Sequence, residues 1–379
     1  MIKIYPKTRN SNTELLRIIA MFLIVISHIS AHGLHFIGED IADTFQKRVV
    51  QSFINFGAIG NCIFMLISGY FLCGTEFKLK KVKSLYIKLF VYSATMGVLA
   101  YLLKVKMFGG GYSQYLTSNY QQFFVTRDIK HLIKSFIPFI SMQNWYITLY
   151  IIFYCLSPFC NKLVLGMSKK EHLLLIGILV TLNGIFPNLL CFDYVRYSNS
   201  LALFFTYFFI GAYIKKYEPE VLKKQTLLIL LTLVFFCILL LSRNIIYVFG
   251  IACPVIRNNQ TRILSLFEGM DRIFTFCLVI AVFSIFRNIN IGSNKIINFI
   301  SASTLSIYLI HENPNVKYFI WNDIFHCYDL RDSDFLLLSV VWIGIIVFYA
   351  CTVIYFFEYL TVRALRKLKS KNEKTSRSI

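Results

Sequence analysis

The sequence predicts an all-α integral membrane protein with about ten transmembrane helices and both termini in the cytoplasm. The first observation behind this prediction is composition: 57% of the residues are hydrophobic, only 15% are charged, and the mean hydropathy is +0.62. In soluble domains, about a quarter of the residues are charged. The second observation is a series of long apolar runs, and the third is the placement of the lysines and arginines.

Each apolar run is roughly 20 residues long, which as a helix covers about 30 Å of hydrocarbon. The connections between the runs are short for independent domains. We therefore expect one membrane domain over residues 1–379, ending in a basic cytoplasmic tail at about 363–379. In chain order, the predicted spans are residues 15–36, 49–73, 85–108, 144–161, 172–190, 199–214, 225–249, 271–286, 296–312 and 334–361.

Lysines and arginines concentrate in every second connection between these runs. With the N-terminus inside, the inner connections hold more of them than the outer loops do, in a smaller total length. This bias is the positive-inside rule, and it places both termini in the cytoplasm. The net charge of +20 then faces anionic lipid of the inner leaflet, so it does not require a nucleic-acid partner.

The first apolar run carries an arginine and a histidine where ionisable groups are costly. Arg17 and His28 are eleven residues apart, about 1,100° of helical rotation and about 16 Å of rise, so both leave the helix on nearly the same face. Glu14 lies one turn before Arg17, and His32 and His35 lie one and two turns beyond His28. Ionisable groups inside a span usually face a polar cavity or a substrate path. This face therefore predicts a functional site.

Simpler interpretations apply to single members of this set. Arg17 alone would be expected to extend its side chain to the lipid headgroups. The spacing of His28, His32 and His35 is compatible with a metal site, but no acidic or thiol ligand accompanies them in the sequence. We therefore expect no metal.

A second informative segment ends the second span and enters a basic run. Ser68 and Gly69 are small residues that let another helix approach closely, and packing is the more economical interpretation of the pair. The lysines that follow, including Lys80 and Lys83, obey the positive-inside rule. They would equally suit a polyanionic cytosolic ligand, and the sequence leaves both interpretations open.

These residues resemble the membrane-bound acyltransferase-3 family of bacterial O-acyltransferases. The resemblance covers most of the chain, from residue 12 to residue 311. It rests on the Arg17 and His28 spacing with Asn12-Thr-Glu-Leu-Leu-Arg-Ile-Ile-Ala20, on Ser68-Gly-Tyr-Phe-Leu72, on Trp145 with Tyr154 and Pro158, on Phe209-Ile-Gly-Ala-Tyr213 and on Ser303-Thr-Leu-Ser-Ile-Tyr-Leu-Ile-His311.

The resemblance implies transfer of an acyl group, usually acetyl, from acyl-CoA to a hydroxyl of an envelope glycan or its lipid-linked precursor. The location it implies is the bacterial cytoplasmic membrane. A hydroxyl needs a general base at neutral pH, and histidine has a suitable pKa. We expect His28 to be that base and Arg17 to orient the coenzyme A. The remaining expected contacts are Glu14, Ser68, Gly69, Lys80 and Lys83 for the donor, and His32, Trp145, Tyr154 and His311 for the acceptor.

The chain departs from the family pattern at two places. Many relatives have a glutamate five or six residues after the tryptophan, where this chain has Tyr150 and Ile151. Relatives often have arginines where this chain has Lys80 and Lys83, which keep the charge but lose the bidentate fork. For His311, capping the end of its helix is as good an explanation as acceptor binding.

Two other classes of membrane protein compete with the acyltransferase. A transporter or flippase of lipid-linked sugars also has many spans and intramembrane charge, but inverted repeats are expected there and none is evident. A glycan polymerase is the other alternative, for which we expect a large outer loop rich in arginine. Acceptor sugar, acyl group and oligomeric state stay open.

Overall fold

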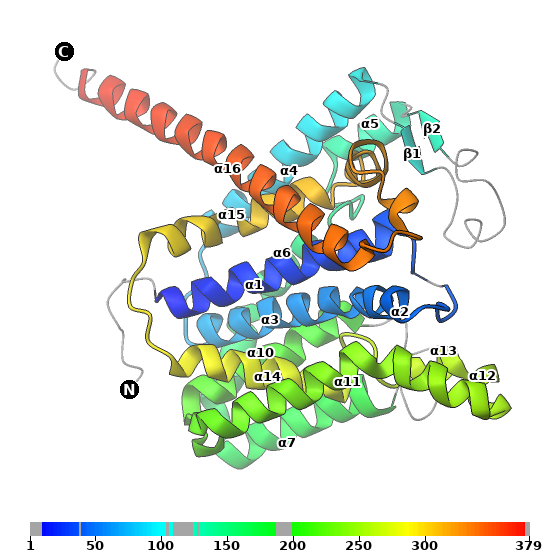
Figure 1. The fold of residues 1–379 in the computed structure, drawn as a ribbon. Coiled ribbons are helices and arrows are strands. Elements are labelled where there is room, and N and C mark those ends of the chain that lie inside the picture. The colour runs from blue at the N-terminus through cyan, green and yellow to red at the C-terminus, as the bar shows by residue number, and fades with distance from the viewer. Residues whose placement is uncertain are drawn as a thin grey trace.

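The computed structural model describes residues 10–37, 39–103, 106–108, 124–126, 129–186 and 199–375. The basic residues before Asn10, the end of the predicted span at 172–190 and the last four residues of the predicted tail lie outside them. Helices dominate the described residues, and α16 projects beyond the other helices at its C-terminal end (Figure 1).

Most helices coincide with the apolar runs of the sequence. In chain order they are α1 (Ser11–His28), the π-helical turn η1 (Ile29–Gly33), α2 (Phe45–Ser52), α3 (Ile54–Leu72), α4 (Leu79–Leu102), α5 (Ile129–Phe136), α6 (Trp145–Gly166), α7 (Lys169–Val180), η4 (Thr181–Ile185), α10 (Asn199–Tyr217), η5 (Glu220–Lys223), α11 (Gln225–Ala252), α12 (Pro254–Asn258), α13 (Gln260–Leu264), α14 (Ile273–Asn288), α15 (Lys295–His311), η6 (Phe319–Ile324), η7 (Cys327–Leu330) and α16 (Leu336–Thr375).

Among the described residues, six helical stretches are long and apolar enough to cross a membrane. They are Ser11–Gly33, Phe45–Leu72, Leu79–Leu102, Trp145–Gly166, Gln225–Ala252 and Leu336–Leu365. The protein is therefore a helical, multi-pass membrane protein. The other four predicted spans correspond to α7 with η4, α10, α14 and α15, so the count of ten and the orientation of the termini stay predictions.

The third predicted span, residues 85–108, extends too far. Helix α4 ends at Leu102, and Lys106–Phe108 (β1) pairs antiparallel with Phe124–Thr126 (β2) instead. The 24 residues of α4 already cover about 36 Å, which is enough to cross the hydrocarbon. The all-α prediction therefore holds for the bundle, with this short ribbon added beside it.

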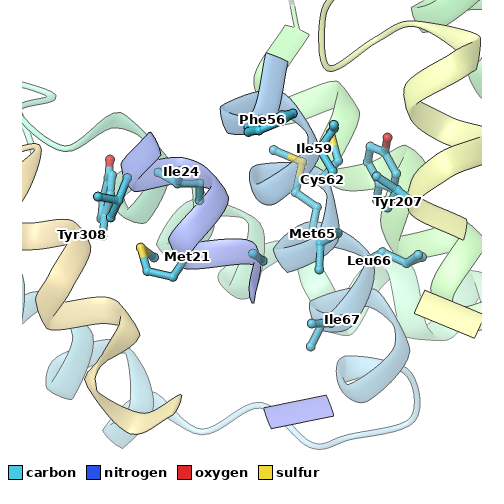
Figure 2. Close-up of a cluster of buried hydrophobic side chains, with 14 of the residues drawn as sticks. Met21, Ile24, Phe56, Ile59, Cys62, Met65, Leu66, Ile67, Tyr207 and Tyr308 are labelled. Atoms are coloured by element: carbon cyan, nitrogen blue, oxygen red, sulfur yellow. The ribbon is translucent and has the colours of Figure 1, made fainter. Parts of the chain in front are cut away.

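Helices α1 and α3 lie at the centre of the bundle. Helix α3 packs against α1 and α10, and α1 also packs against α15. Figure 2 shows the shared core: Met21 and Ile24 come from α1, Met65 from α3, Tyr207 from α10 and Tyr308 from α15. These side chains are buried. Because Met21 and Ile24 lie on the face of α1 that carries Arg17 and His28, this face points into the protein.

Helix α15 runs parallel to α1 along most of its length. At the start of α1, Ser11 Oγ donates to Asn298 Oδ1 at 3.0 Å and accepts from the Asn294 amide at 2.7 Å. One turn later Ser301 Oγ donates to Glu14. At the far end His28 meets His311. The two helices thus begin and end together, which brings two distant parts of the sequence into one site.

Candidate active site

The candidate site is centred on His28 at the end of α1. Its Nδ1 atom lies 2.9 Å from His311 Nε2 and 3.2 Å from Glu312 Oε2. His311 is fully buried, and its Nδ1 lies 2.6 Å from the carbonyl oxygen of Ile307, one helical turn earlier in α15. His28 and His311, which the sequence analysis selected separately, therefore belong to one cluster.

The backbone contact of His311 determines which nitrogens carry protons. A carbonyl oxygen only accepts, so His311 Nδ1–H is the donor to Ile307. In a neutral ring His311 Nε2 then has the lone pair and accepts from His28 Nδ1–H. His28 Nε2 consequently keeps its lone pair and can accept a proton. The Glu312 carboxylate faces the same His28 ring. When the His28 ring takes up a proton and becomes an imidazolium, this negative charge stabilises it.

Glu312 also joins His32 and Lys317 to the cluster. Its Oε1 atom lies 2.9 Å from Lys317 Nζ and 3.5 Å from His32 Nε2. Burial alone would lower the pKa of Lys317, but the neighbouring Glu312 carboxylate raises it, so the ammonium stays charged at neutral pH. The expectation that no acidic group accompanies the histidines is wrong, because this carboxylate reaches them from the end of α15.

A change of helix type at the end of α1 positions His32. The α-helix continues as the π-helical turn η1, in which His32 lies. Such π turns recur at functional sites. The turn ends at Gly33, where a Cβ atom would lie 2.9 Å from that of Cys327. His35 follows with φ of 55° and contacts the rings of Tyr318 and Tyr328 instead of the His28 cluster.

Arg17 lies at the other end of the same face. Its guanidinium donates to Glu14 Oε1 at 2.7 Å and lies 5.7 Å from the centre of the Phe71 ring. The Glu14 side chain is 9% exposed and the Arg17 side chain 28% exposed. Because Ser301 holds the second Glu14 oxygen, the carboxylate is fixed and in turn orients Arg17. Glu14, which the sequence places one turn before Arg17 on the same face, therefore forms an ion pair with it.

A cavity of about 180 Å³ lies between the Arg17 and His28 levels. Met21 and Ile24 line it, and they occupy the turns of α1 between those two residues. Its other walls include Ser68, Tyr146, Tyr150 and Tyr308. Tyr308 lies one turn before His311 in α15, so the cavity lining comes within one helical turn of the histidine pair.

The basic run after α3 divides between two surfaces. Lys80 and Lys83 line a separate groove of about 1340 Å³ between α4 and α16, together with Arg363. Lys81 instead donates to the Tyr150 hydroxyl at 3.0 Å, beside the interior cavity. The sequence did not distinguish Lys81 from Lys80 and Lys83, because the rotation of α4 about its axis decides which of these lysines faces the cavity.

The other predicted contacts are dispersed. Gly69 is covered by α10, because a Cβ there would lie 2.5 Å from the Phe208 Cα, so it serves helix packing. The Tyr154 hydroxyl accepts from the Lys78 amide at 3.0 Å and lies at the basic end of the protein. Trp145 begins α6 and contacts the ring of Tyr146. Among the predicted acceptor contacts, His32 and His311 lie in the cluster around His28.

Fold and site define a multi-pass membrane protein with a cluster of histidines and a glutamate at the end of α1 and a cavity beside the preceding turns of that helix. A family profile described as an acyltransferase domain matches residues 10–359. The chain belongs to the acyltransferase-3 family, and the class of activity is therefore acyl transfer. No curated protein and no solved structure matches the chain.

Proposed function

We propose that this protein is an O-acyltransferase of a bacterial cytoplasmic membrane. It moves an acetyl or another short acyl group from acyl-CoA to a sugar hydroxyl of a cell-surface polysaccharide or its lipid-linked precursor. The observation that carries the proposal is the single face of α1: the cavity lined by Met21 and Ile24 lies on this face, between the level of Arg17 and the level of His28.

The donor binds from the end of the cavity nearer to Arg17. A guanidinium held by Glu14 and the Lys81 ammonium supply the positive charge that coenzyme A phosphates require. The thioester then enters the cavity towards His28. Lys80 and Lys83 line the separate groove, so they contribute at most to the field that attracts the anionic donor.

At the other end His28 activates the acceptor. Its Nε2 removes the proton from the sugar hydroxyl while the oxygen attacks the thioester carbonyl carbon. The carbon–sulfur bond then breaks, and the thiolate takes the proton from the imidazolium as coenzyme A leaves. Glu312 stabilises the imidazolium between these steps, and His311 keeps the ring in the tautomer that leaves Nε2 free.

The test is release of free thiol from acetyl-CoA by the purified protein in lipid, with a crude glycan or lipid-linked acceptor. We expect His28→Asn to lower kcat by about 10²–10⁴-fold, the usual contribution of a general base. His326→Asn is the matched control: this histidine is exposed and has the positive φ that asparagine tolerates. Equal turnover by His28→Asn and wild type would contradict the role of His28.

Arg17→Ala tests the donor end in the same assay. Loss of one charged hydrogen-bonding group costs about 1.5–3 kcal/mol, so the KM for acetyl-CoA should rise by about tenfold to a hundredfold with a smaller change in kcat. No acyl-CoA binding or turnover by wild type with any acceptor would instead favour a transporter or flippase of lipid-linked glycans.

A further inference from the structure

His28 and the three side chains His32, His311 and Glu312 beside it also have the composition of a cation site. One nitrogen each of His28 and His32 and one oxygen of Glu312 all lie within 4.8 Å of one another. His28 and His32 are four residues apart, the spacing at which two histidines on one helix bind zinc together. Two histidines and one glutamate form a known three-ligand set for zinc that leaves a fourth position open.

His311 adds a second observation. Its Nε2 atom points its lone pair at His28 Nδ1 from 2.9 Å, close to the separation of two ligands on one tetrahedral ion. Its Nδ1–H donates to the Ile307 carbonyl, and histidine ligands of metals almost always hold their other N–H in this way. The contact that orients His311 for His28 therefore also orients it for a metal.

The carboxylate supplies the third observation. Lys317 and His32 lie beside Glu312 Oε1, whereas Oε2 is buried and, within the part of the chain that the structure describes, makes no hydrogen bond. This oxygen faces His28 Nδ1 at 3.2 Å. A buried carboxylate oxygen beside three imidazoles is a natural oxygen ligand for a divalent transition metal.

We propose that His28, His32, His311 and Glu312 form a binding site for Zn²⁺. Coordination uses His28 Nδ1, so the proton that this atom otherwise donates to His311 moves to Nε2 of the neutral ring, which then has no lone pair to accept a proton. The zinc-loaded state and the base-catalysed state therefore exclude one another, so zinc is a reversible inhibitor of acyl transfer. This site goes beyond the proposed acyl transfer, because the binding of zinc can be measured without any turnover.

The experiment is zinc binding by the purified full-length protein in lipid, by metal analysis and by competition with a chromogenic chelator. We expect one zinc per chain, and His32→Gln and Glu312→Gln should each weaken binding by at least about tenfold. Lys317→Met should strengthen it, because a like charge beside the ion is removed. His326→Asn, at an exposed histidine, is the control and should bind as wild type does.

Cobalt provides a readout that does not depend on how well a variant folds. Co²⁺ added to wild type should give the intense visible bands of a tetrahedral site, and excess Zn²⁺ should abolish them. Binding of no more zinc by wild type than by a His32→Gln/Glu312→Gln double variant would overturn the proposal. That result would leave the proposed acyl transfer standing, whereas zinc binding without acyl-CoA turnover would contradict only the acyl transfer.

Discussion

His28 acquires its chemistry from side chains that lie far along the chain. Its hydrogen-bond partner His311 is 283 residues away, and Glu312 follows directly. The helical backbone at Ile307 sets the tautomer of His311, which in turn sets that of His28. A fixed tautomer matters because it decides which of the two ring nitrogens has the lone pair that can accept a proton.

Substitutions at Glu312 and Lys317 separate the contribution of this ion pair to stability from its contribution to catalysis. Glu312→Gln leaves the Lys317 ammonium buried without its counter-charge, which should destabilise the protein by roughly 3–5 kcal/mol. It should also lower kcat, since the His28 imidazolium loses its carboxylate. In the double variant Glu312→Gln/Lys317→Met the buried charge is gone, so we expect most of the stability to return but not the activity.

Thermal unfolding in detergent and thiol release measure the two effects independently. Lys317→Met alone is the control for the change at that position. Recovery of both stability and turnover in the double variant would contradict a catalytic part for Glu312 and leave it as a structural ion-pair partner.

At the scale of elements, two close approaches organise the bundle around the site. Gly69 and Gly211 bring α3 and α10 together: a Cβ at Gly211 would lie 2.5 Å from the Tyr70 amide nitrogen. At the end of α1, the π turn and Gly33 let the chain pass Cys327 while keeping His32 at Glu312. Each glycine allows an approach that an added side chain would prevent, to backbone atoms at Gly69 and Gly211 and to the Cys327 side chain at Gly33.

Gly69→Ala tests whether this residue serves packing. The added methyl group meets the backbone of α10, which can move only with its whole helix, so we expect a loss of about 1–3 kcal/mol in thermal unfolding. Gly177→Ala in α7 is the matched control, because nothing lies within 4 Å of its added Cβ. That substitution should be neutral or stabilise by up to about 1 kcal/mol. A wild-type melting temperature for Gly69→Ala would show that α3 and α10 need no close approach.

At the scale of the whole molecule, the connection between α14 and α15 bears on the number of spans. The Ser11 amide at the start of α1 donates to the Gly292 carbonyl at 3.0 Å, so this connection lies on the same side as the N-terminus. With an N-terminus in the cytoplasm, ten spans put residues 289–294 inside. If only the six longest helical stretches crossed, that connection would be outside.

Labelling of single cysteines in intact cells decides between these topologies. In a background without native cysteines, we expect Asp43→Cys to react with a membrane-impermeant maleimide and Ser293→Cys to react only after permeabilisation. Both positions are exposed in the structure. Reaction of Ser293→Cys in intact cells would contradict the ten-span topology with a cytoplasmic N-terminus.

The sequence by itself determined the class of fold, because apolar runs long enough to cross a bilayer have few other uses. It also determined the Arg17 and His28 face, since eleven residues come close to three full turns of a helix. Likewise, the pairing of Glu14 with Arg17 follows from spacing within one helix.

Only the tertiary structure decided which distant residues complete the site. The parallel run of α15 beside α1 brings Glu312 and Lys317 to His28, and the rotation of α4 turns Lys81 but not Lys80 or Lys83 towards the cavity. Periodicity within a helix shows which residues share a face. It does not show which other helix that face will meet, because that depends on how all the helices pack together.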